Sequence, residues 1–108
     1  MIPAGEALAL DALIQPAEQG IASRVLARSA GGNVTLFAFD ANQGLTEHTT
    51  AFDALALVLS GSLTLTVGGA PVEAAAGSIV RLPANIPHAV DATAPSRMLL
   101  IMMKDLPV

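Results

Sequence analysis

From Gly20 onward the sequence is a succession of short strand-like stretches separated by glycine, proline, asparagine and aspartate. Spacing of roughly 8–12 residues between such stretches is the rhythm of all-β sandwiches and barrels. The stretches are residues 21–28, 33–39, 52–59, 62–67, 72–75, 78–82, 88–92 and 97–103. They predict a closed or double-sheet β architecture, because about eight strands close around an interior that side chains or a small ligand can fill.

The chain has 108 residues, which is enough for one domain and too few for two. We therefore expect one domain over residues 1–108, with residues 1–20 as an N-terminal extension. Residues 3–15 of that extension are predicted to form a helix, because Leu8 and Ala12 fall at helical spacing. Hydrophobic residues make up 53% of the chain and charged residues 13%, a composition that excludes intrinsic disorder.

Charge and residue types exclude several partners and chemistries. The net charge is −4 and the five basic residues are scattered, so we expect neither a nucleic-acid nor a membrane partner. With no cysteine there is no disulfide, thiolate metal site or thiol nucleophile. Residues 1–10 lack the pattern of a secretory signal, which predicts a cytoplasmic location. Residues 54–72 carry no charge, but the alternation within them predicts two strands rather than a membrane helix.

Two of the expected strands, residues 54–59 and 98–103, are apolar on both faces. Such strands need cover on both sides, and a chain of this size has few elements to supply it. We therefore predict a homodimer with residues 98–103 near its interface. The alternative is that Met98, Met102 and Met103 fill gaps in a single core.

His48 and His88 are the only imidazoles of the chain. His88 ends the segment GSIVRLPANIPH (residues 77–88), and His48 lies in GLTEHTT (residues 44–50), ahead of FDALALVLSG (residues 52–61). Together these blocks resemble the two motifs of the cupin superfamily, G-x5-H-x-H-x3,4-E-x6-G and G-x5-P-x-G-x2-H-x3-N.

The second motif is matched at three of its five marked positions, by Gly77, Pro83 and His88, with Asn85 at its second glycine and Ala92 at its asparagine. The resemblance covers about residues 33–103 and is to small single-domain cupins of the Cupin_2-like conserved-barrel kind. It implies a double-stranded β-helix, or jelly-roll barrel, of about eight or more strands.

The first motif fits in more than one register. Counted back from Gly61, its glutamate falls on Ala54, and with the shorter spacer its two histidines fall on His48 and Thr50. The other registers place the histidine pair on Glu47 and Thr49, or on Thr46 and His48 with Asp53 as the glutamate. A β-bulge would decide between the registers.

The resemblance implies a site of three histidines and a glutamate that holds iron, manganese, zinc, nickel or copper. This chain can offer His48, His88 and a carboxylate from Asp53 or Glu47. Two histidines and one carboxylate form a known facial set for ferrous iron. Strand alternation places Glu47 opposite to His48, and it brings Asp53 to the same side as His48 only if a turn or bulge intervenes.

Besides a chain that keeps the fold for dimerisation or stability alone, two functions remain open at this point. One is a metal-dependent enzyme of the dioxygenase or isomerase kind, with a small-molecule substrate in the barrel and His48, His88, Asp53 and Glu47 as candidate ligands. The other is a metal-free barrel that binds or senses a small organic molecule. In the plainer interpretation of the two carboxylates, Glu47 is a solvated charge and Asp53 begins a strand.

Overall fold

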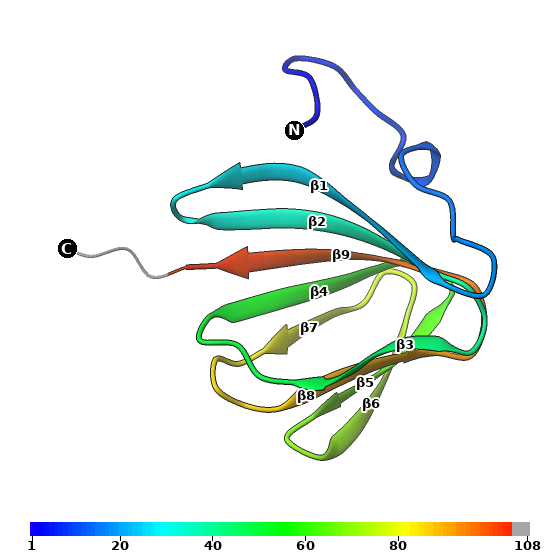
Figure 1. The fold of residues 1–108 in the computed structure, drawn as a ribbon, viewed down its shortest axis with the longest axis vertical. Coiled ribbons are helices and arrows are strands. Elements are labelled where there is room, and N and C mark those ends of the chain that lie inside the picture. Colours follow the sequence, from blue (N-terminus) through cyan, green and yellow to red (C-terminus); the bar gives the residue numbers. More distant parts are fainter. Residues whose placement is uncertain (105–108) are drawn as a thin grey trace.

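In a computed structural model, which describes residues 1–104, the chain forms nine strands and one short 3-10 helix (Figure 1). The strands are β1 (Ile21–Ser29), β2 (Gly32–Phe39), β3 (Gln43–His48), β4 (Asp53–Ser60), β5 (Ser62–Val67), β6 (Ala70–Ala75), β7 (Ile79–Leu82), β8 (His88–Ala92) and β9 (Ser96–Met103). They form two antiparallel sheets, with strand orders β1-β2-β9-β4-β7 and β3-β8-β5-β6. The expected all-β jelly-roll architecture is confirmed.

All eight expected strands are present, with bounds that shift by at most two residues. The ninth strand, β3, was not predicted, because QGLTEH is polar and its side chains are half-buried or exposed. The predicted helix over residues 3–15 is wrong for most of its length, since only the 3-10 turn Leu10–Ala12 forms. Within residues 1–104, no helix has the length and hydropathy needed to cross a membrane.

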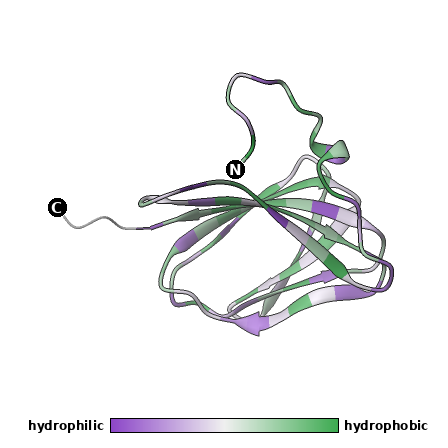
Figure 2. Cartoon of the chain, turned by 45° about the horizontal axis from the view of Figure 1, so that its top comes forward, coloured by the Kyte–Doolittle hydropathy of each residue, from purple (hydrophilic) through white to green (hydrophobic). Residues whose placement is uncertain are grey.

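The main core fills the space between the sheets, and we call the side of each sheet that faces this space its inner face. Alternation along the strands is visible as bands of hydropathy in Figure 2. The fully buried inner-face residues are Phe39, Ala54, Ala56, Val58, Leu63, Leu65, Ala74, Leu82, Val90, Ala92 and Met98. Burial of each large apolar side chain contributes about 1.5–3 kcal/mol, so this core is the principal source of stability.

The N-terminal extension covers part of the outer face of the five-stranded sheet. Ile14 packs there against Leu26 and Leu36 in a second buried cluster. The extension is held by its backbone, because Arg24 Nη1 donates to the Leu13 carbonyl (3.2 Å) and Arg97 Nε to the Ile14 carbonyl (3.3 Å). These hydrogen bonds to the sheet hold this part of the extension in an irregular conformation. The spacing of its apolar residues alone had favoured a helix.

The two ends of the barrel differ in how the sheets are connected. At one end, which we call the joined end, four connections of one to three residues pass between the sheets: residues 40–42, 61, 76–78 and 93–95. The Ser96 hydroxyl of β9 also accepts the Ser62 N–H of β5 there (3.1 Å). Gly61 has a φ of +74°, and a Cβ at this position would collide with the Ser96 hydroxyl. This close approach explains the glycine that closes the first motif.

At the other end, which we call the mouth, only residues 49–52 and 83–87 pass between the sheets. The hairpins β1–β2 and β5–β6 turn back at this end without crossing. β3 ends and β8 begins here, so both histidines lie at the mouth.

Candidate site at the paired histidines

The fold brings His48 and His88 together. They lie opposite one another in the β3–β8 register, with ring centroids 4.4 Å apart and an angle of 69° between the ring planes. A bulge between Leu45 and His48 places an extra residue on β3, so both of these side chains share the inner face with Val90 and His88. His88 is only 5% exposed, whereas His48 is exposed at the rim. The pair therefore spans from the interior to the edge of the mouth.

Each ring is oriented by the backbone two residues before it. His48 Nδ1 lies 2.8 Å from the Thr46 carbonyl oxygen, and His88 Nδ1 lies 3.2 Å from the Ile86 carbonyl oxygen. A carbonyl only accepts, so each Nδ1 carries the proton and each neutral ring keeps its lone pair on Nε2. The site therefore offers two imidazole lone pairs from adjacent strands.

Burial lowers the pKa of His88 below its ordinary value of 6.5. The hydrogen bond to the Ile86 carbonyl acts in the opposite direction, and the nearby His48 adds a smaller lowering of the pKa. His88 is consequently neutral at pH 7, which is the state that binds a metal or accepts a hydrogen bond.

Asp53 lies on the outer face, away from the histidines. Its carboxylate accepts the Ala84 N–H (2.7 Å) and pairs with Arg81 Nη2 (3.2 Å). These contacts, the Ala84 N–H first, hold the pKa of Asp53 below its usual range. Asp53 thus ties β4 to β7 and to the loop after it, which agrees with its interpretation as a strand-starting residue.

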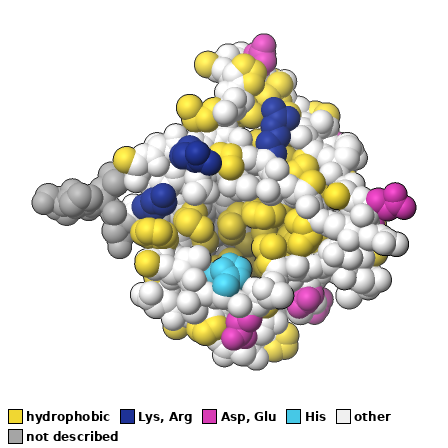
Figure 3. Space-filling model, in the orientation of Figure 1, with side chains coloured by type: hydrophobic (Ala, Val, Ile, Leu, Met, Phe, Trp, Pro, Cys, Tyr) yellow, Lys and Arg dark blue, Asp and Glu magenta, His cyan; other side chains and the backbone are white. Residues whose placement is uncertain are grey.

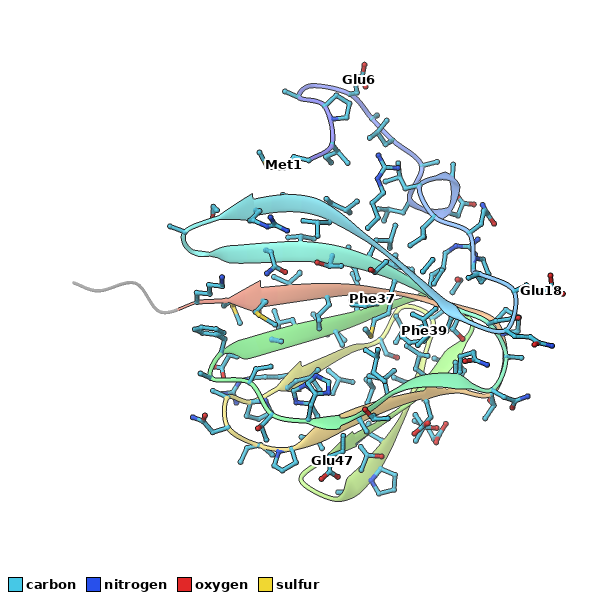
Figure 4. All side chains as sticks on the ribbon, in the orientation of Figure 1. Met1, Glu6, Glu18, Phe37, Phe39 and Glu47 are labelled. Carbon is cyan, nitrogen blue, oxygen red and sulfur yellow. The ribbon has the colours of Figure 1, made fainter. Side chains whose placement is uncertain are left out.

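Glu47 lies in the β3 bulge and points away from the space between the sheets (Figure 4). Across residues 1–104, no three or more His, Asp or Glu side chains are placed to hold one metal ion. The structure therefore brings together two of the four candidate ligands and separates Asp53 and Glu47 from them. At the remaining motif positions, Thr50 Oγ1 donates to the Phe52 carbonyl (3.0 Å) and Ala54 is buried.

The surroundings of the pair are apolar. Val67 is opposite His88 in the β5–β8 register, and Leu45 and Leu100 are further half-buried side chains that pack against the inner core. Figure 3 shows hydrophobic side chains gathered between the strands of the two sheets, with a histidine at the edge of this patch. Sequence reasoning missed Val67 and Leu45 as site residues, although the alternation in residues 62–67 could have indicated Val67.

The loop before His88 adopts the backbone that the second motif requires. Asn85, at the motif's second glycine, has a φ of +63°, a conformation that asparagine tolerates better than most residues. Its N–H donates to the Thr50 carbonyl (2.7 Å), which joins this loop to the one that follows His48. The replacement of glycine by asparagine therefore leaves the geometry of the loop intact.

A model of the cupin domain family, Cupin_2, matches residues 35–103. The chain belongs to the cupin family. A cupin superfamily protein from Desulfitobacterium hafniense is 27% identical, with a TM-score of 0.89 over 96% of this chain and 95% of that one. A conserved protein of unknown function from Streptococcus pyogenes is 28% identical, with a TM-score of 0.92 over 98% and 93% of the two chains. No protein with a curated description matches.

A Cupin 2 conserved barrel domain protein from Leptotrichia buccalis is 35% identical over 87% of this cupin but only 46% of its own chain, with a TM-score of 0.83. KdgF from Halomonas sp. is 21% identical, with a TM-score of 0.75 over 84% and 86% of the two chains, and it shares the fold. The expected resemblance to small cupins is therefore confirmed.

Proposed function

We propose that this cupin binds a small molecule at the mouth of its barrel, with His48 and His88 as polar anchors and a divalent transition metal on their Nε2 atoms. The observation that supports the proposal is the facing pair of imidazoles, each with Nδ1 satisfied by a backbone carbonyl. Apolar surroundings with a few convergent polar groups are the usual composition of a small-molecule site.

The donor set fits a metal through two nitrogen ligands. Imidazole nitrogen suits zinc, copper, iron and nickel, and the remaining coordination positions would be filled by water and the small molecule. A metal held there would supply Lewis-acid polarisation of a carbonyl, which an isomerase uses, or, if it is redox-active, activation of molecular oxygen, which a dioxygenase uses. The chain's own contributions are the Nδ1 protons held by backbone carbonyls, the neutrality of His88 and the apolar side chains of Val67 and Leu45 on the same inner face.

A second candidate is a barrel that binds its ligand without metal or catalysis. The observation that favours it is the position of Asp53 on the outer face, which leaves two protein donors where a facial set has three. In this case the Nε2 atoms of His48 and His88 would accept hydrogen bonds from the ligand.

Elemental analysis of untagged protein, purified without chelator, tests the first candidate. We expect near-stoichiometric iron, manganese, zinc, nickel or copper in the wild type and none in His48→Ala or His88→Ala. Glu47→Ala is the matched control and keeps its metal. Metal-free wild type after reconstitution, or equal occupancy in His88→Ala, would reject the shared metal site and leave the metal-free barrel.

We also propose a homodimer formed through the outer face of β4, β7 and β9. The half-buried Leu57 and Leu99 pair there, and the neighbouring Ile79 is 58% exposed. Light scattering of the wild type is expected to give about twice 10.9 kDa, and Ile79→Asp the monomer mass. A wild type that is monomeric at micromolar concentration contradicts the dimer.

The domain organisation and location are part of the proposal as well. We take residues 1–108 as one domain, in which residues 1–20 extend a barrel over residues 33–103, and we place the protein in the cytoplasm. The packing of Ile14 on Leu36 supports one cooperative unit. The one-domain statement predicts a single unfolding transition when two spectroscopic probes are compared. Fractionation of the native host tests the location.

A further inference from the structure

The charges of this acidic cupin are not evenly distributed between its faces. Asp53, Glu73 and Asp91 lie on outer faces, where Asp53 pairs with Arg81 and Glu73 accepts a hydrogen bond from Thr64. Asp40 binds the Gln19 N–H at the joined end, Glu47 points outward (Figure 4), and Glu6, Asp11 and Glu18 belong to the extension. Within residues 1–104, no carboxylate lies on an inner face.

Lys104 lies at the mouth on the inner side of the five-stranded sheet. Its N–H donates to the Gly31 carbonyl (2.8 Å), which continues the β2–β9 ladder by one residue. Alternation then places it on the same face as Leu100 and Met102. Its Nζ lies 5.7 Å from the centre of the Phe52 ring, so the cation is held beside an apolar surface at the entrance.

Arg28 lies on the same inner face, in β1, which is two strands away from β9. A bulge between Val25 and Ala27 puts Arg28 opposite Asn33, which is itself opposite Met102. The one ion pair among residues 1–104 joins Arg81 to Asp53, so neither mouth cation has a carboxylate partner in that part of the chain.

The cations and the histidine pair belong to the same end of the barrel. His48 is four residues before Phe52 in the chain, and Phe52 contacts Lys104. Figure 3 shows Lys and Arg side chains on one side of the hydrophobic patch and a histidine on the other. A molecule lying on this patch would meet basic groups at one end and imidazole at the other.

We propose that the ligand of this site is a small carboxylate with an apolar body, an inference that rests on the proposed binding function of the mouth. Arg28 and Lys104 hold the carboxylate, and the body lies against Phe52 and the inner-face hydrophobic residues, with its far end toward His48 and His88. Guanidinium and ammonium groups form strong charge-assisted hydrogen bonds with carboxylates. Basic groups beside a low-dielectric surface also concentrate anions around a protein whose net charge is −4.

Titration calorimetry with hexanoate and hexanamide, which share a body and differ in charge, tests the proposal. The protein is used metal-free and at low salt, so that binding does not depend on a metal. We expect hexanoate to bind about tenfold more tightly than hexanamide, as a charge-assisted bond would give. Arg28→Met and Lys104→Met each reduce this preference, whereas Arg81→Met, which removes an outer-face cation, leaves it unchanged.

Three results would overturn the proposal. They are equal affinity for the two probes, no hexanoate binding at millimolar concentration, and a preference that Arg28→Met and Lys104→Met leave intact. A preference that appears only with metal and disappears in His48→Ala would place the anion on the metal, which rejects the role of the cations but keeps the proposed function. A preference that persists in metal-free His48→Ala supports the cations even if the metal site itself is rejected.

Discussion

The two faces of the five-stranded sheet are built by the same strands from similar apolar residues, yet they are covered differently. The inner face is buried along β2, β9 and β4, where Phe39, Met98 and Val58 are fully inaccessible. The outer face is divided, since the extension covers the half around Leu36 and leaves the half around Ile79 open. Apolar sequence on both faces of a strand thus shows that cover is needed but does not show what supplies it.

The largest loss of stability should come from a substitution on the inner face. Met98→Ala removes a fully buried side chain and should lower the free energy of unfolding by about 2–5 kcal/mol. Leu57→Ala, on the open outer half, should cost clearly less because its side chain is only half-buried. Urea denaturation at concentrations that keep the protein monomeric measures both, and equal losses would contradict the difference between the faces.

A substitution on the covered half of the outer face should cause an intermediate loss of stability. Ile14→Ala should cost about 2 kcal/mol, because Ile14 is 8% exposed and packs on the sheet. Leu10→Ala is the matched control in the same extension, since Leu10 is 39% exposed and should have little effect. If Ile14→Ala is as mild as the control, the extension does not stabilise the sheet.

Low pH should destabilise the inner side of the barrel through protonation of His88 on unfolding. Its folded-state pKa is lowered, so below the ordinary value of 6.5 the unfolded chain binds a proton that the folded chain does not. Stability of the metal-free protein should therefore fall as the pH drops below about 6.5, with a slope of at most about 1.4 kcal/mol per pH unit from this group. Comparing wild type with His88→Gln by thermal unfolding isolates the effect, and identical pH profiles would argue against it.

The smallest effect should come from the exposed ion pair on the open outer half. Asp53→Asn keeps an oxygen for the Ala84 N–H and loses only the charge beside Arg81, so its stability should fall less than that of Ile14→Ala. Its metal content should equal that of the wild type. Loss of metal in this variant would mean that Asp53 acts as a ligand despite its outward position.

The sequence was informative wherever alternation and turn residues coincided. Thr64 and Thr66 alternate with Leu63 and Leu65, so β5 was predicted at its observed bounds. The segment ending at His88 was placed correctly because Gly77 and Asn85 mark turns with positive φ. The fold could thus be predicted almost completely.

The site was harder to predict because it depends on one inserted residue. The bulge before His48 changes which residues of this segment face inward, and nothing in QGLTEH marks it. In β4, alternation independently turns Ala54 inward and Asp53 outward, and Ala54 is the glutamate position of the shorter-spacer register of the first motif. Asp53 therefore lies on the side that the sequence allowed only in the absence of a turn or bulge before it, which matches its plainer interpretation as the first residue of a strand.

The unequal connection of the sheets has a mechanical consequence. Four tight crossings and the Ser96–Ser62 bond fasten the sheets at one end, while two longer loops join them at the other. The two sheets are thus fastened most firmly at the end of the barrel that lies far from the histidines. Because the β-ladders run within each sheet and not between the sheets, a separation of the sheets would leave both ladders paired, and we expect it to be largest beside His48.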